Sequence, residues 1–130
     1  MNEREMIART KQFALRTMKL MGALPKTIQG RAIGSQLMRS GTSVAVNYWA
    51  ACRARSKAEF VSKLGTVEEE ADETAFWLEL IIEGELLKES QVRPLLTEAG
   101  ELVAITAASK KTASATLARS QIANRKSQIS

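Results

Sequence analysis

Apolar residues recur along the chain at alternating steps of three and four, which is the spacing of one face of an α-helix. This pattern is interrupted near residue 25, near residue 54 and just before residue 90. It therefore predicts four helical segments joined by short connections. Short connections place successive helices side by side in opposite directions. The sequence predicts an all-α protein, an antiparallel up-down-up-down four-helix bundle.

The first two helices have broad apolar faces and recognisable ends. Leu24-Pro25 ends the first, because a residue before proline disfavours the α conformation. Thr27 is placed to cap the second, which would run to about Ala51. Glycines interrupt the apolar stripe of this second helix, and each costs about 1 kcal/mol relative to alanine. At Gly41 two explanations stay open: close approach of a neighbouring helix, or a kink.

The third helix is the longest of the predicted helices and has the most regular core seam. Ser56 and Glu59 fit a capping box at its start. The seam alternates by four and three residues through Phe60, Leu64, Val67, Ala71, Thr74, Leu78 and Ile81. A second apolar stripe, formed by Phe76, Leu80 and Leu87, must meet another helix or another subunit.

The fourth helix becomes less apolar towards the C-terminus. Ser90 is a fair cap for it, and Pro94 falls near its first turn. Beyond about Ala107 the apolar positions are mostly Ala, Ser and Thr. The sequence therefore predicts a bundle over residues 1–115 and a basic tail, frayed or disordered, over residues 116–130.

Charge is strongly segregated along the chain. Residues 1–67 carry a net charge of +9, residues 68–101 carry −9, and residues 102–130 carry +5, which matches the total of +5. One interpretation is that basic and acidic helices lie side by side and compensate each other. The other is that one face presents a basic surface to nucleic acid. The two interpretations are compatible.

Composition argues against most catalytic and membrane classes. The chain has no histidine, which is the commonest general base and metal ligand, and its single cysteine, Cys52, cannot build a zinc site. Cys52 continues an apolar stripe and fits a small core residue. We expect no enzyme activity and no cofactor, with a metal-dependent enzyme as the third choice. No run approaches a membrane span, so the expected location is the cytoplasm.

Basic side chains are the one positive functional signal. A cluster lies between the second and third helices, with further cations on the flanking helices; the candidate nucleic-acid-binding residues are Arg31, Arg39, Arg53, Arg55, Lys57 and Lys63. Exposed arginines near a helix N-terminus bind phosphates through charge, fork geometry and free amides. No aromatic platform is expected beside them, so stacking of bases is not indicated.

Three segments together resemble a known family. They are Ser35 to Asn47, Cys52 to Phe60, and Lys63 to Thr74 followed by Trp77-Leu78. The resemblance is to the four-helix-bundle proteins encoded in intervening sequences of bacterial large-subunit ribosomal RNA genes. That family includes the accessory variability determinant of diversity-generating retroelements. The similarity covers about residues 5–108 and is most specific over residues 36–78.

The resemblance implies more than the residue pattern does. Members of the family form antiparallel four-helix bundles that assemble into homopentameric barrels. The retroelement branch binds nucleic acid on a positively charged surface and associates with a reverse transcriptase. By motif position, Arg39, Arg53, Arg55 and Lys57 would form that surface here. The chain departs from the common pattern at Ala45, where many members have proline, and at Ala50-Ala51.

Two functions follow as expectations. The first is a non-enzymatic accessory protein, expected to be a ring-shaped homo-oligomer, that binds RNA or DNA through phosphates and supports a reverse transcriptase. The alternative is a protein–protein adaptor that does not contact nucleic acid directly. In this alternative the acidic third helix matters as much as the basic cluster.

Overall fold

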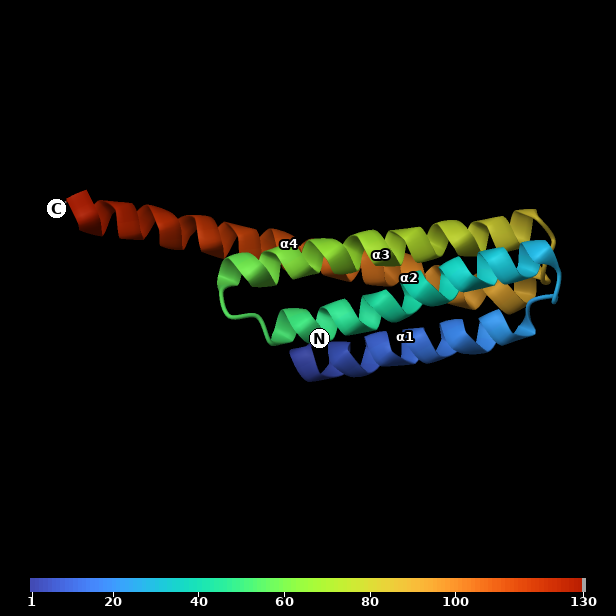
Figure 1. Cartoon of the computed structure of the whole chain (residues 1–130). Helices are drawn as coiled ribbons and strands as arrows, with labels where there is room; N and C mark the ends of the chain where they lie inside the picture. The colour runs from blue at the N-terminus through green and yellow to red at the C-terminus, as the bar shows by residue number, and fades with distance from the viewer. Residues whose placement is uncertain (130) are drawn as a thin grey trace.

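Four α-helices make up the computed structural model, which describes residues 1–129 and has no strand among them. Their bounds are α1 Glu3–Ala23, α2 Ile28–Cys52, α3 Lys57–Glu83 and α4 Glu89–Ile129. Successive helices run in opposite directions and pack against each other (Figure 1). The prediction of an all-α four-helix bundle is confirmed.

Local signals set the helix ends much as the sequence predicts. The hydroxyls of Thr27 and Ser56 each accept a hydrogen bond from the amide three residues later, at 3.0 and 3.1 Å. These bonds satisfy first-turn amides that have no partner inside the helix. Asn2 caps α1 in the same way. Leu24, the residue before proline, is extended and ends α1.

The start of α4 differs from the prediction. The helix begins at Glu89 rather than after a Ser90 cap. The Gln91 side chain takes the capping role by accepting a hydrogen bond from the Lys88 amide at 3.2 Å. A glutamine three residues inside a helix can reach back to the amide before it, which the search for a short N-cap residue overlooked.

The C-terminal part of α4 projects beyond the other three helices (Figure 1). The sequence predicted a frayed or disordered tail over residues 116–130, whereas the structure describes residues 116–129 as helix. Residue 130 lies outside the described residues. No glycine or proline follows Gly100, and the segment is rich in Ala, Lys and Arg, which favour helix even without a core to pack against.

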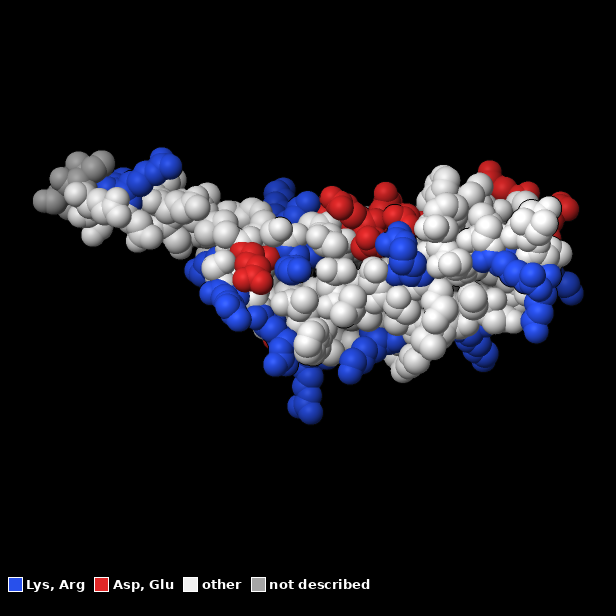
Figure 2. Space-filling view, viewed as in Figure 1, with Lys and Arg blue, Asp and Glu red and all other residues white. Residues whose placement is uncertain are grey.

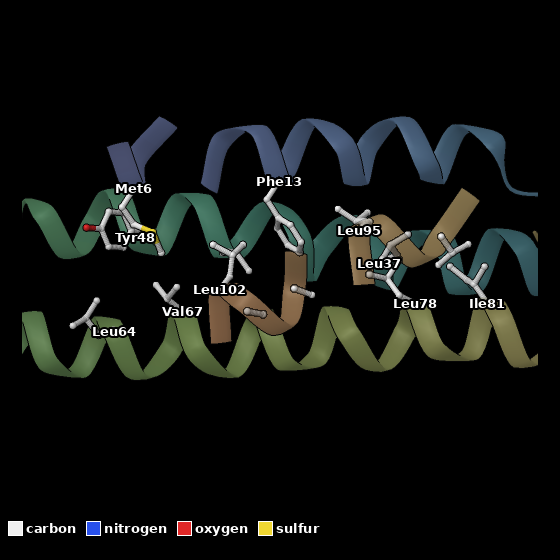
Figure 3. Packing of buried hydrophobic residues seen from close by; sticks show 14 of the residues in the cluster. Met6, Phe13, Leu37, Tyr48, Leu64, Val67, Leu78, Ile81, Leu95 and Leu102 are labelled. Atoms are coloured by element: carbon white, nitrogen blue, oxygen red, sulfur yellow. The ribbon is translucent and has the colours of Figure 1, made fainter. Parts of the chain in front are cut away.

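Each helix contributes one stripe to a continuous core (Figure 3). Phe13 of α1, Leu37 of α2 and Leu102 of α4 are fully buried. The predicted seam of α3 is confirmed, because every member from Leu64 to Ile81 is buried. Phe60, at the start of the seam, is half-buried and packs against the core.

Close approach of α1 and α2 explains Gly41. A Cβ atom at this position would lie 2.5 Å from Cγ2 of Thr17 on α1, much closer than carbon atoms can pack. At Gly34 an added Cβ would lie 3.1 Å from Leu24. The close approach of a neighbouring helix expected at Gly41 is therefore confirmed, within an α2 that runs from Ile28 to Cys52.

The second apolar stripe predicted for the third helix is only partly on α3 and only partly covered. Leu80 is half-buried on α3, whereas Leu87 lies in the connection after Glu83, where it is half-buried and packs against the core. Phe76 stays 52% exposed and makes an edge-to-face contact with Trp77, with ring centroids 5.2 Å apart. The expectation that this stripe meets another helix therefore holds at Leu87, while Phe76 remains at the surface of the chain.

Candidate nucleic-acid interface

The connection between α2 and α3 brings three predicted cations together. Arg53 is the C-cap residue of α2, Arg55 lies in the connection, and Lys57 is the first residue of α3. All three are exposed, and none makes an ion pair within residues 1–129. We call these residues the basic connection. Their charge is held at the N-terminus of a 27-residue helix, where anions are favoured.

Hydrogen bonds fix the backbone of the basic connection. Ser56 caps α3, and the Glu59 carboxylate reaches back towards the connection. The predicted capping box is present in a shifted form, because Glu59 accepts from the Arg55 amide at 3.1 Å rather than from the Ser56 amide. The backbone of Arg55 is therefore held in place while its side chain remains exposed.

An aromatic ring accompanies the basic connection, and the sequence reasoning missed it. The Arg53 guanidinium lies over the Trp49 ring, 4.7 Å from the ring centroid. Trp49 is 46% exposed. The expectation that no aromatic platform lies beside the cations is therefore wrong. The available signal was the spacing of four between the two residues, which places them one turn apart on the same helix face.

A shallow cleft of about 400 Å³ opens next to the basic connection. Arg55, Lys57, Phe60, Cys52 and Glu3 are among the residues that line it. Cys52 is half-buried at the edge of the core, and burial is the main cause that raises the pKa of its thiol. The thiol is thus held in its protonated form at neutral pH, which agrees with a packing role rather than a reactive one.

Arg39 lies away from this cluster and is engaged in ion pairs. Its guanidinium pairs with Glu70 at 3.3 Å and, more closely, with Glu73, both on α3. The hydrogen bond to Glu73 is the main cause that raises the pKa of Arg39. In turn the hydrogen bond from Trp77, and then that from Arg39, lower the pKa of Glu73. Arg39 therefore braces α2 against α3.

The other two candidates are placed at different distances from the basic connection. Lys63 is half-buried on α3, six residues after Lys57, or about 9 Å along the helix. Arg31 is exposed near the start of α2, about 33 Å from Arg53 along the helix axis. Of the six predicted residues, the three of the basic connection therefore lie together and Lys63 lies near them. Arg39 is held in ion pairs between α2 and α3, and Arg31 lies at the far end of the bundle.

Compensation between basic and acidic helices is confirmed elsewhere in the bundle. Arg9 of α1 donates to Glu98 of α4 at 2.6 and 2.7 Å and to Glu101 at 2.7 Å. Lys110 of α4 pairs with Glu68 of α3 at 2.9 Å. Figure 2 shows the remaining pattern, with Lys and Arg mostly along the edge where α1 lies and Asp and Glu mostly along α3.

Residues 1–129 contain no group of three His, Cys, Asp or Glu side chains placed to hold a metal ion. None of the helices over the same residues combines the length and the apolar character needed to cross a membrane.

Comparison with known proteins agrees with this architecture. The fold and the basic connection define an all-α four-helix-bundle protein with a cationic end. The chain belongs to the 23S rRNA-intervening sequence protein family, whose model matches residues 2–108. No curated protein matches the chain. The family predicted from the three sequence segments is thereby confirmed.

A solved structure shows the same fold. It is the crystal structure of a protein of unknown function from the S23 ribosomal protein family of Bacteroides thetaiotaomicron. The two chains are 30% identical, with a TM-score of 0.79. The similarity covers 85% of this chain and 99% of the other. The shared part is therefore the bundle, and the excess belongs to this chain.

Proposed function

We propose that this protein is a non-enzymatic nucleic-acid-binding accessory protein whose contact surface is the basic connection. The observation that carries the proposal is that Arg53, Arg55 and Lys57 are exposed and make no ion pair within residues 1–129. By contrast, Arg9 and Arg39 in the middle of the bundle pair with carboxylates. Unpaired cations at a helix N-terminus fit the phosphate backbone of a polyanion. The family name ties these proteins to intervening sequences of 23S rRNA, so RNA is the first ligand to test.

Binding of this kind has a recognisable signature. Contacts to phosphates release condensed counterions, so affinity falls steeply with salt and depends little on base sequence. Each phosphate contact that is lost lowers the slope of log affinity against log salt by about one. Trp49 can add a contact to an unpaired base, because its ring is half-exposed beside Arg53.

The test is a titration of RNA and DNA at two salt concentrations. Wild type is compared with Arg53→Ala/Arg55→Ala and with Lys26→Ala/Arg31→Ala, which removes the same charge at the far end of the bundle. We expect the first variant to lose affinity and about two units of salt slope, and the second to resemble wild type. Absence of binding at low salt, or equal losses in both variants, would refute the proposal.

We further propose that the chain assembles into a homopentameric ring. Large apolar side chains remain exposed on α1 and α2 and need a partner surface: Leu15, Met18 and Val46. A ring would repeat the basic connection five times and raise avidity without tight single sites. Light scattering should give five times the 14.3 kDa of one chain. A monomer at micromolar concentration would refute the ring.

The acidic outer face of α3 favours a second role, as an adaptor for a basic protein such as a reverse transcriptase. Phe76 lies among exposed carboxylates on this face: Glu69, Asp72, Glu79 and Glu83. In a retroelement both roles would operate together. A complex with the reverse transcriptase that survives nuclease treatment, and is lost in Glu79→Lys/Glu83→Lys, supports the adaptor. Loss on nuclease treatment alone supports binding through nucleic acid only.

A further inference from the structure

The longest helix continues past the bundle that the family shares. α4 has 41 residues, whereas α1, α2 and α3 have 21, 25 and 27. The family match ends at residue 108, and the Bacteroides protein leaves 15% of this chain uncovered although 99% of its own length is matched. We call residues 109–129 the α4 arm. Its first ion pair, from Lys110 to Glu68, fastens it to α3.

Cations of the α4 arm gather on one side of the helix. At 100° per residue, Lys111, Arg119, Arg125 and Lys126 fall within about a third of the circumference. All four are exposed, and small or apolar residues lie between them on the same side: Ala115, Ala118 and Ile122. Leu117 and Ser120, on the opposite side, are half-buried.

This face carries charge of one sign only. No acidic residue follows Glu101 in the chain. A helix face that serves only solubility carries charges of both signs, because pairs spaced by three or four residues stabilise it. Arg125 and Lys126 also stabilise the C-terminal end of the helix through its dipole. Lys111 and Arg119 lie too far from that end to do so, and they need another explanation.

The α4 arm leaves the bundle at the end that holds the basic connection. Lys110 pairs with Glu68, and α3 runs back from Glu68 to Lys57 over about 16 Å. Because α4 is antiparallel to α3, the arm runs alongside these turns and then passes beyond Lys57 (Figure 1). Figure 2 shows basic side chains both on the projecting helix and at this end of the bundle. Residues more than 50 positions apart are thus brought to one end.

The chemistry of the arm selects the ligand. α4 contains no aromatic residue, so the arm has no platform on which an unpaired base could stack. Lys111 to Lys126 spans about 22 Å, comparable to about six or seven phosphates along one strand at ~3.4 Å each. A straight, cationic helix with small residues between its charges fits the backbone of a rigid duplex.

We propose that the α4 arm is a second contact for double-stranded RNA, which extends the footprint of the basic connection along the duplex. This inference rests on the proposed function, since it adds a contact to the same ligand. Two contacts on one rigid ligand reinforce each other, because the second forms at high effective concentration once the first is made. Only a duplex long enough to reach both contacts gains from the arm.

Duplex length is the variable that tests the proposal. Full-length wild type is titrated with RNA hairpins whose stems have about 4 and about 24 base pairs, shorter and longer than the ~22 Å that the arm spans beside the basic connection. The test variant is Lys111→Gln/Arg119→Gln/Arg125→Gln. The matched control is Lys26→Gln/Arg31→Gln/Lys88→Gln, which removes three exposed cations from the far end. Circular dichroism checks that helix content is kept in both variants.

We expect wild type and the control to bind the long duplex 10- to 100-fold more tightly than the short one, on the order expected for about three added phosphate contacts. The arm variant should bind the short duplex like wild type and lose most of this length dependence. An arm variant that keeps the wild-type ratio overturns the inference and leaves the proposed function standing. If wild type binds neither duplex but binds single-stranded RNA or DNA, the inference fails and the proposed function stands. If wild type binds no nucleic acid at low salt, the proposed function itself fails.

Discussion

Arginine side chains have different partners in the middle of the bundle and at the end that holds the basic connection. In the middle, Arg9 and Arg39 each contact two carboxylates on a neighbouring helix. At the end, Arg53 and Arg55 have no such partner within residues 1–129. The difference is one of surroundings, because Glu98 and Glu101 face Arg9 and Glu70 and Glu73 face Arg39, whereas the Glu59 carboxylate at the connection accepts from the Arg55 backbone amide. A count of basic residues therefore says little about binding until the paired ones are set aside.

Helices pack closely in the middle of the bundle, and substitution of Gly41 tests this packing. We expect it to have the largest effect on stability of the changes considered. Gly41→Ala should lower the free energy of unfolding by about 2 kcal/mol, because the new Cβ meets Thr17 and the overpacking outweighs the helix propensity gained. Gly100→Ala is the matched control. Nothing lies within 4 Å of its added Cβ, so it should stabilise the protein by about 0.5–1 kcal/mol. Urea unfolding measures both, and equal effects would contradict the close contact.

Loss of the ion pairs between α1 and α4 should have the next largest effect on stability. Arg9→Gln removes three hydrogen bonds to Glu98 and Glu101 and leaves Glu98, whose side chain is 14% exposed, without its counter-ion. We expect a loss of about 1–2 kcal/mol in the free energy of unfolding. Lys11→Gln, an exposed position on the same helix, should change it by less than about 0.5 kcal/mol. Similar values for both variants would mean that the ion pairs of Arg9 do not stabilise the fold.

Acid should lower the stability of the fold through the paired carboxylates in the middle of the bundle. The hydrogen bond from Arg9 is the main cause that lowers the pKa of Glu98, and Glu73 is lowered by Trp77 and Arg39. A carboxyl whose folded pKa is below its ordinary value stabilises the fold above about pH 4.3, and that contribution is lost as pH falls through the lower folded value. The urea midpoint should therefore drop between pH 6 and pH 3. Arg9→Gln should show a smaller drop, and an unchanged drop would contradict the assignment.

The smallest expected effect on stability is at the basic connection. Neutralising Arg53, Arg55 and Lys57 to Gln should change the free energy of unfolding by no more than about 0.5 kcal/mol, because none of the three is buried or ion-paired. The same variant should lose nucleic-acid affinity. Thermal unfolding and a binding titration on one preparation measure the two effects together. A large loss of stability would place these residues in the framework instead of at an interface.

The helices and their core faces could be predicted because they depend on local spacing. The α3 seam, the Thr27 and Ser56 caps and the proline stop all follow from residues a few positions apart. The brace from Arg39 to Glu70 joins residues 31 positions apart, and that from Arg9 to Glu98 joins residues 89 apart. Such pairs depend on how far one helix slides along another, which single-helix periodicity does not contain.

The candidate site was predicted in part for the same reason. Arg53, Arg55 and Lys57 stay together because they are neighbours in the chain. Arg31 and Arg39 shared only the sign of their charge with them, and the length of α2 separates them. Trp49 had a local signal that was overlooked. The loss of large apolar residues beyond Ala107 indicated that the chain leaves the bundle there, but not that it continues as helix.

Gly41 and Thr17 lie far apart in the sequence but share the same small space between α2 and α1. A larger side chain at one position requires a smaller one at the other. We therefore expect the two positions to vary together among homologous chains. In a Gly41→Ala chain, Thr17→Ala would remove the two closest contacts but keep Cβ of residue 17 at 2.8 Å from the new Cβ, so it would relieve the overlap only in part. A bulky residue at both positions would force α1 away from α2.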